Sequence, residues 1–223
     1  LTPIQLSAQR LRKRYEHLLK GDGAVLEKCT STIIKQVEEL KNLVNEFSNF
    51  ARLPAAELAP RDLNGVVKEA LFLYAEGHKG IDFQFIKNED LPLVDLDLEQ
   101  AKRALINLLD NAVAAVGKKG WVKISTEYDP SMGVVNLEIA DNGCGIAPEV
   151  RDRIFDPYFS TKEEGTGLGL TIVSAIVSDH RGYIRVRQNE PKGTRVIIEL
   201  PVSKQAGSPE IQKRVHGASS ART

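Results

Sequence analysis

Two neighbouring glycine clusters constrain the fold of this chain more than any other feature. The first, DNGCG at residues 141–145, follows an apolar run at residues 134–140 that predicts a strand. The second, GTGLG at residues 165–169, leads directly into an apolar pattern of helical spacing. Glycine lets a backbone approach a ligand closely and adopt dihedral angles that other residues avoid. The clusters therefore predict a strand end and a helix start that both contact a ligand.

Each cluster suits a different part of a nucleotide. The carboxylate of Asp141, held at a strand end, can accept a hydrogen bond from an exocyclic amine such as that of adenine. Glycines at a helix start present backbone N–H groups and the positive end of the helix dipole to a phosphate. Between the clusters, residues 155–164 (FDPYFSTKEE) offer a mobile cover. Two ordinary tight turns are also rich in glycine, so the clusters alone leave that alternative open.

A helix predicted at residues 97–116 supplies a third element. Asp97 begins it, with Gln100 three residues later as in a capping box. Asn107 and Asn111 are four residues apart and therefore share one face, away from the apolar positions. Two amides on one helical face can supply oxygens to a hydrated Mg²⁺ and N–H donors to phosphates. Either Asn alone is typical of a helix surface; together with the glycine clusters they favour a nucleotide site.

Composition excludes several classes of partner. Among 223 residues, 30 Lys and Arg balance 30 Asp and Glu, so we expect no binding to nucleic acid and no contact with a membrane surface. Cys29 and Cys144 are far apart and lack metal-ligand spacing, which favours a reduced, cytoplasmic setting. No apolar run approaches membrane-spanning length and no signal peptide is visible, so any inner-membrane anchor is expected in upstream segments.

The remaining pattern predicts two domains. Residues 1–53 read as a helical hairpin with apolar residues at heptad spacing, including Leu26, Ile33 and Leu40. We expect a homodimer that forms a four-helix bundle, because two helices alone cannot bury so wide a stripe; packing on the downstream domain is the alternative. Residues 54–60 read as a linker. Residues 61–202 alternate helices and strands as in an α+β two-layer sandwich, and residues 203–223 read as a flexible tail.

Taken together, the motifs resemble the Bergerat (GHKL) ATP-binding domain of two-component sensor histidine kinases. The segments that carry this resemblance are an N box at residues 107–111 (NLLDN), a G1 box at 141–145, an F box at 155–159 (FDPYF), a G2 box at 165–170 (GTGLGL) and Gly193-Thr194. The hairpin is similar to the dimerisation and phosphotransfer domain of the same family. The segments LTPIQLSAQRL and FSTK are similar to nitrogen-regulation kinases of the NtrY and NtrB type.

This resemblance implies ATP and Mg²⁺ as ligands and assigns roles to residues. Asp141 would bind the adenine amino group with Thr194 assisting through water, and Asn111 would ligate Mg²⁺. Asn107 would lie near the γ-phosphate, and Lys162, in a lid at residues 147–164, would meet it. The other residues implied to contact the nucleotide are Gly143, Gly145, Ile146, Tyr158, Thr166, Gly167, Leu168, Gly169 and Leu170. These roles suit phosphoryl transfer, which needs positioning, charge neutralisation and exclusion of water.

One departure from the family pattern concerns charge at the site. The family often carries a basic residue three positions after the magnesium-binding Asn, where this chain has Ala114. Lys162, Lys118 and Lys119 are open candidates to replace it.

A second departure concerns the phosphoacceptor. The family places this histidine in a motif of the form His-Glu-x-x-Asn-Pro directly before LTPIQ, where the chain begins. His17, His78, His180 and His216 lack that context, and we interpret them as surface or structural histidines. The chain is therefore expected to be the catalytic portion of a histidine kinase, with its upstream part removed. It would bind ATP without labelling itself, and its onward partner would be the receiver-domain aspartate of a response regulator.

Two alternatives stay open. Another GHKL ATPase or a serine kinase of the anti-sigma type would share the boxes. Such ATPases typically place a water-activating Glu at the position of Asn107, which argues against hydrolysis, and the hairpin argues against the anti-sigma type. The other alternative is a non-catalytic, nucleotide-gated dimer that acts by binding a regulator.

Overall fold

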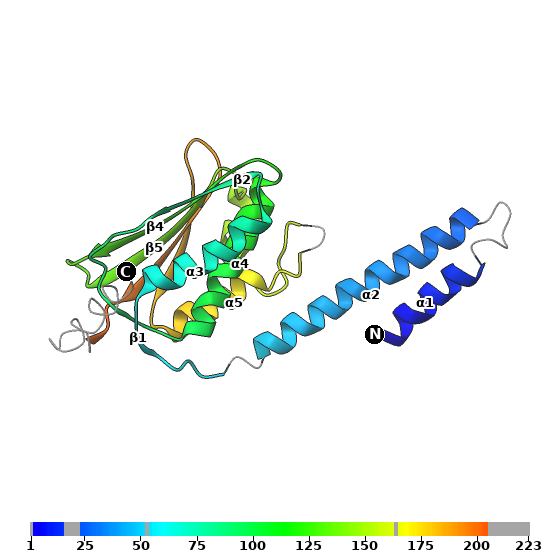
Figure 1. Cartoon of the computed structure of the whole chain (residues 1–223), viewed down its shortest axis with the longest axis horizontal. Helices are drawn as coiled ribbons and strands as arrows, with labels where there is room; N and C mark the ends of the chain where they lie inside the picture. The colour runs from blue at the N-terminus through cyan, green and yellow to red at the C-terminus, as the bar shows by residue number, and fades with distance from the viewer. Residues whose placement is uncertain (1, 16–22, 52–53, 163–164, 205–223) are drawn as a thin grey trace, which may run out of the picture. The chain divides into compact units, whose positions relative to one another are not determined.

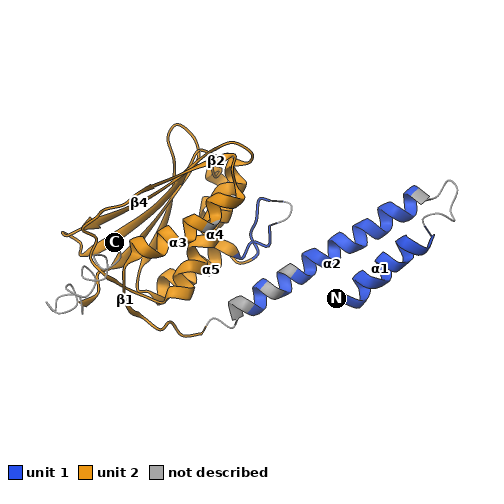
Figure 2. Ribbon diagram, viewed as in Figure 1, with its two compact units in different colours: residues 1–53, 158–168 blue, residues 54–157, 169–223 orange. Residues whose placement is uncertain are grey.

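A computed structural model of the chain describes residues 2–15, 23–51, 54–162 and 165–204. These residues belong to two compact units (Figure 2). Unit 1 is drawn from residues 1–53 and 158–168, and unit 2 from residues 54–157 and 169–223. Each unit is described by itself below.

Unit 1 contains the predicted pair of helices, α1 (Thr2–Tyr15) and α2 (Gly23–Ala51), which lie side by side (Figure 1). Ala8 of α1 and both Thr30 and Val37 of α2 are buried, which places the contact between the two helices on these faces. Gln5 also donates a hydrogen bond to Glu38 across the pair, at 2.8 Å.

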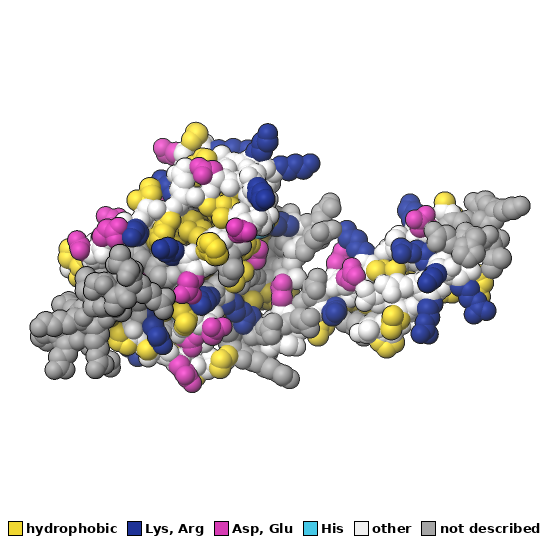
Figure 3. Space-filling model, in the orientation of Figure 1, with side chains coloured by type: hydrophobic (Ala, Val, Ile, Leu, Met, Phe, Trp, Pro, Cys, Tyr) yellow, Lys and Arg dark blue, Asp and Glu magenta, His cyan; other side chains and the backbone are white. Residues whose placement is uncertain are grey.

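Most of the heptad stripe is not covered by the pairing of α1 with α2. Ile33, Leu40 and Phe47 are 43%, 51% and 47% exposed. Figure 3 shows hydrophobic side chains on the surface of these helices between Lys, Arg, Asp and Glu side chains. Leu18 and the side chain of Phe50, which the heptad pattern also includes, lie outside the described residues. The exposed stripe is the surface on which the predicted homodimer depends, and the homodimer stays a prediction.

Unit 2 is built on a five-stranded mixed sheet of strand order β2-β4-β5-β7-β6. Its strands are β2 (Ile81–Ile86), β4 (Gly120–Asp129), β5 (Val134–Asp141), β6 (Tyr183–Gln188) and β7 (Thr194–Pro201). Only β2 and β4 are parallel; β4, β5, β7 and β6 are antiparallel neighbours. Strands β5 and β7 pair from Val134–Pro201 to Ala140–Arg195, so the end of β5 lies next to the start of β7.

Three helices cover one face of this sheet: α3 (Leu63–Gly77), α4 (Leu98–Val116) and α5 (Gly169–Asp179) (Figure 1). A 3₁₀ helix, η1 (Pro148–Arg153), follows β5. The core lies between the layers, where Val122, Leu137, Leu108 and Val173 are almost fully buried. Alternate residues of β5 are buried because successive side chains of a strand point to opposite faces. The architecture confirms the predicted α+β class with two layers.

Part of the stretch predicted as a linker forms a strand. Within residues 54–60 the chain forms the start of β1 (Ala59–Arg61), which pairs antiparallel with β3 (Val94–Leu96). The Glu57 N–H donates to the Asp97 carboxylate at 3.0 Å, and the Gln100 amide donates to the Pro54 carbonyl at 2.9 Å. The sequence did not indicate these bonds, because the partners are some forty residues away, where local composition carries no information about them.

The ends of two other predicted segments also shift. Asp97 caps α4 by accepting from the Gln100 N–H at 3.0 Å, but the Gln100 side chain bonds to Pro54, so only half of the capping box forms. Ser203, predicted to begin a flexible tail, is 3% exposed and donates its N–H to the Leu93 carbonyl at 2.9 Å. Residues 205–223 lie outside the described part of the chain.

Two of the four histidines can be placed. His78 follows α3, where its ring stacks on Tyr74, and His180 is buried at the end of α5. His17 and His216 lie outside the described residues. Within the described ranges, none of the helices is both long enough and apolar enough to cross a membrane.

Candidate functional site

The amides of α4 and the start of α5 meet at one point of unit 2. Gly169 is the first residue of α5, and a methyl group at its Cα would lie 3.1 Å from Asn107 Oδ1 and 3.8 Å from Asn111 Nδ2. The Asn107 amide also donates to the Arg103 carbonyl at 2.9 Å, which fixes the side chain along the helix. The N box and the end of the G2 box are therefore in contact, although they are far apart in the sequence. A side chain at position 169 would therefore crowd the Asn107 amide and lie in contact with that of Asn111.

The carboxylate of Asp141 is buried at the end of β5 and held by backbone groups. Its Oδ1 accepts from the Gly143 N–H at 2.8 Å and from the Thr194 N–H at 3.2 Å. Asp141 and Thr194 are 4% and 6% exposed. One donor comes from the loop after β5 and the other from the first residue of β7. Two donors from different segments together fix the orientation of the carboxylate. A carboxylate held in this way presents a defined acceptor direction to a base.

The loop after β5 is attached to the last turn of α4. The Cys144 N–H donates to the Ala115 carbonyl at 3.0 Å, and a side chain at Gly143 would overlap the Ala115 backbone. Asn142 accepts from the Trp121 N–H at 2.8 Å. Gly145 has a φ of 77°. The first glycine cluster is thus required by close packing against the helix that carries Asn107 and Asn111, as well as by backbone conformation.

Asn189 is a contributor that the sequence did not indicate. Its side-chain amide is buried and donates to the Asp141 carbonyl at 2.8 Å. It comes from the turn between β6 and β7, where Asn is ordinary. No local signal could have identified it, because its partner is on another strand of the sheet.

The residues predicted around the lid are divided between the units: Tyr158 and Gly167 belong to unit 1 and Ile146 to unit 2. Tyr158 has a φ of 65° and donates its N–H to the Gly167 carbonyl at 3.1 Å. Gly167, with a φ of 71°, packs so closely against the backbone of Tyr158 and Phe159 that a side chain there would overlap them. The F box and the G2 box are therefore bound to each other. Ile146 in unit 2 is half-buried just before η1.

Four further predicted residues lie between residues 162 and 170. Lys162 is exposed, and its N–H donates to the Ser160 hydroxyl at 3.1 Å. Thr166 donates its hydroxyl to the Glu46 carboxylate of α2. Leu168 is fully buried, and Leu170 in unit 2 is half-buried. The predicted approach of Lys162 to a phosphate stays a prediction.

The comparison with known proteins decides the family. The HATPase_c family, described as histidine kinase-, DNA gyrase B- and HSP90-like ATPase, matches residues 96–204. The solved catalytic domain of the histidine kinase ThkA is 33% identical, with a TM-score of 0.61, over 67% of this chain and 99% of that domain. The chain belongs to the sensor histidine kinase family. Its ATP-binding domain is therefore of the type that the sequence motifs resemble.

Longer histidine kinases match beyond the ATP-binding domain. Nitrogen regulation protein NtrY of Azorhizobium caulinodans is 35% identical over 205 residues, which cover 90% of this chain and 26% of NtrY. A histidine kinase ThkA solved in complex with the response regulator protein TrrA is 30% identical with a TM-score of 0.69, over 92% of this chain and 58% of that one. This chain thus spans about a quarter of the length of NtrY.

Proposed function

We propose that this chain is the catalytic portion of a sensor histidine kinase that binds Mg-ATP and donates the γ-phosphoryl group to a histidine. From there the group would pass to a response-regulator aspartate. One observation carries the proposal: Asn107 and Asn111 of α4 meet Gly169 at the start of α5. This contact places two amides beside the N-terminus of a helix, where backbone N–H groups and the helix dipole favour phosphate.

The proposal assigns a role to each residue. The Asp141 carboxylate accepts from the adenine amino group, and Thr194 assists through water. Residues 167–169 lie against the phosphate chain, Asn107 orients the γ-phosphate, and Lys162 neutralises its developing charge. The lid at residues 147–164 excludes water that would otherwise hydrolyse ATP.

The amides also fit a magnesium ion. Among the described residues, no group of three or more His, Cys, Asp or Glu side chains is placed to hold a metal. Mg²⁺ bound with a nucleotide needs only one or two protein oxygens, because phosphates and water supply the rest. The Asn111 side chain would be that ligand, and the ion would neutralise phosphate charge when bound.

The partners belong to the same proposal. The similarity to ThkA, whose complex contains the response regulator protein TrrA, supports a receiver domain as the onward acceptor. The exposed heptad stripe of α2 supports a homodimer. Similarity to NtrY supports nitrogen regulation as the pathway. A cytoplasmic location suits all three, with any inner-membrane anchor in another part of the protein.

Incubation of the chain with γ-labelled Mg-ATP tests the activity. We expect bound ATP, little released phosphate and no label on this chain. Addition of a histidine-containing hairpin from a related kinase would supply an acceptor and should give acid-labile label on that hairpin. Steady phosphate release without such transfer would instead indicate an ATPase.

Replacement of the proposed metal ligand tests the magnesium assignment. Asn111→Ala should remove the tightening of ATP binding by Mg²⁺, because the amide oxygen is lost, while binding measured in EDTA changes little. Calorimetric titration with and without magnesium measures both. If the magnesium dependence survives in the variant, Asn111 is not the ligand.

A further inference from the structure

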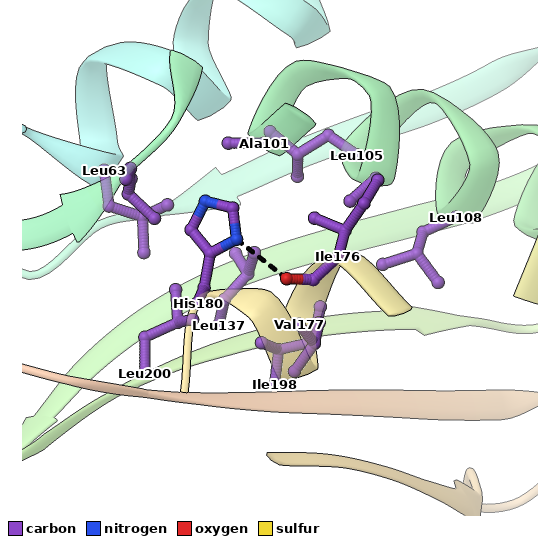
Figure 4. A pocket seen from close by; sticks show the side chains of 12 residues that line it. Leu63, Ala101, Leu105, Leu108, Leu137, Ile176, Val177, His180, Ile198 and Leu200 are labelled. Atoms are coloured by element: carbon purple, nitrogen blue, oxygen red, sulfur yellow. Dashed lines mark hydrogen bonds between the residues drawn. The ribbon is translucent and has the colours of Figure 1, made fainter. Parts of the chain in front are cut away.

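His180 connects the two helices that form the phosphate end of the site. It follows α5 and is 3% exposed. Its Nε2 accepts a hydrogen bond from the Asp97 N–H at 2.9 Å, and its Nδ1 lies 2.7 Å from the Ile176 carbonyl oxygen (Figure 4). The imidazole therefore joins the end of α5 to the residue that caps the start of α4.

Only one form of the ring satisfies both contacts. The Ile176 carbonyl can only accept, so Nδ1 carries the hydrogen, and the Asp97 N–H can only donate, so Nε2 carries none. His180 is thus neutral and of a single tautomer in this arrangement. Its surroundings support this form, since the ring borders a cavity of about 30 Å³ lined otherwise by apolar side chains such as Leu105, Ile176 and Ile198.

The bond lies at one end of an antiparallel helix pair, and the site lies at the other. From Asp97 to Asn107 is about 15 Å along α4, and from Gly169 to His180 is about 16 Å along α5, at 1.5 Å per residue. The helices make two contacts, Asp97 with His180 and Asn107 beside Gly169. The distance between these contacts is therefore nearly the same along α4 as along α5. Apolar packing between them is tolerant of small axial shifts, whereas a hydrogen bond has a direction and a fixed length.

We propose that His180 is a positioning residue for phosphate binding. Through the Asp97 N–H it sets the axial register of α4 against α5, and so sets the distance between the Asn107 and Asn111 amides and the N–H groups at the start of α5. It touches neither ATP nor metal. This inference rests on the proposed function, because the register matters only if the amides and the start of α5 hold phosphates.

Two variants separate this role from a general loss of stability. In His180→Gln the side-chain oxygen can take the place of Nε2 and accept from the Asp97 N–H. In His180→Asn the shorter amide can take the place of Nδ1 and donate to Ile176, but it leaves the Asp97 N–H without its acceptor. A third variant, Ile198→Val, removes a methyl group from the sheet side of the same cavity. It changes neither of the two hydrogen bonds of His180.

Affinity for Mg-ATP, measured by calorimetry well below the unfolding temperature of each variant, distinguishes them. We expect the dissociation constant to rise about fivefold or more in His180→Asn, the ratio that corresponds to one hydrogen bond. His180→Gln and Ile198→Val should stay within about twofold of the unmodified chain, even where their thermal midpoints fall. Equal affinities for the Asn and Gln variants would overturn the inference.

The tautomer provides a second measurement that needs no ATP. Nitrogen NMR of the chain labelled at histidine should show a protonated Nδ1 and an unprotonated Nε2 for His180 at neutral pH. A proton on Nε2 would overturn the inference directly. Failure of the unmodified chain to bind Mg-ATP would overturn the proposed function as well, whereas binding with equal affinity in all variants would overturn only the role of His180.

Discussion

At the scale of single residues, Asp141 holds backbone groups in place and is also the residue proposed to bind adenine. Oδ1 accepts the backbone N–H groups of Gly143 and Thr194 and so holds two loops together. The proposed adenine contact needs a further acceptor position on the same carboxylate. A substitution that keeps the oxygen bonded to the backbone but replaces the second oxygen with a donor should therefore preserve stability and weaken adenine binding.

Asp141→Asn is that substitution. Its amide oxygen can keep the two backbone bonds, so we expect a thermal midpoint close to that of the unmodified chain. Its NH₂ group would face the adenine amine, donor against donor, and ATP affinity should fall about tenfold or more. Titration with ATP and GTP measures the change. If the unmodified chain binds the two nucleotides equally, Asp141 does not read the base.

Asp97 is a carboxyl group whose pKa is lowered by hydrogen bonds from nearby backbone N–H groups. Partial burial would by itself raise its pKa, but N–H donors from Gln100, Glu57 and Glu99 hold the pKa of this carboxyl below its usual value. A carboxyl with a lowered folded pKa stabilises the fold above its unfolded pKa of about 3.9. That stabilisation is lost as the pH falls through the lower folded value.

The predicted result is a stability difference that depends on pH. Asp97→Asn should be less stable than the unmodified chain near neutral pH, because the amide lacks the charge that strengthens these bonds. The difference should shrink below about pH 4 as Asp97 of the unmodified chain becomes protonated. Urea unfolding of both proteins across this range measures it. A difference that is the same at neutral and acid pH would show that the charge of Asp97 contributes nothing.

At the scale of elements, the loop after β5 and the end of α4 behave as one piece. Gly143 permits this because its Cα faces the Ala115 backbone without a side chain between them. The Cys144 N–H then bonds to the Ala115 carbonyl. The position of Asp141 is therefore coupled to the helix that carries Asn107 and Asn111.

Gly143→Ala should break that coupling. The added methyl overlaps backbone atoms that cannot rotate away, so we expect a loss of about 1–3 kcal/mol in unfolding free energy and weaker ATP binding. Gly77→Ala is the matched control, because nothing lies within 4 Å of the added methyl at the end of α3. It should be neutral or stabilising by about 0.5 kcal/mol. Denaturant unfolding compares the two, and equal stabilities would contradict the packing argument.

At the scale of the whole molecule, the exposed stripe of α2 predicts assembly. Ile33, Leu40 and Phe47 leave much apolar surface uncovered on α2. A second copy is the proposed partner, since heptad spacing matches helix with helix.

Leu40→Asp should convert the proposed dimer to a monomer, because it places a charge in the centre of the apolar seam. Ser31→Asp, on an exposed position away from the seam, should leave the dimer intact. Light scattering after size exclusion measures the mass of each. A monomeric unmodified chain would remove the dimer from the proposal.

Local pattern predicted the elements because each one depends on residues close together in the sequence. The helix predicted at residues 97–116, the strand predicted at 134–140 and the helix predicted after the second glycine cluster match α4, β5 and α5 to within a few residues. Periodicity carries this information, since the face that is buried repeats along each helix or strand. The sequence motifs likewise indicated the family, which the comparison with ThkA confirmed.

Contacts between residues far apart in the sequence determined the features that the sequence did not predict. The stretch predicted as a linker is bonded to unit 2 through β1 pairing with β3, and Asn189 reaches the Asp141 carbonyl from the turn between β6 and β7. His180, interpreted only as a surface or structural histidine, bonds to the start of a helix that precedes it by more than eighty residues. Composition and spacing cannot indicate such partners, because a buried donor needs an acceptor wherever the folded chain brings one, and only the tertiary structure determines which residue that is.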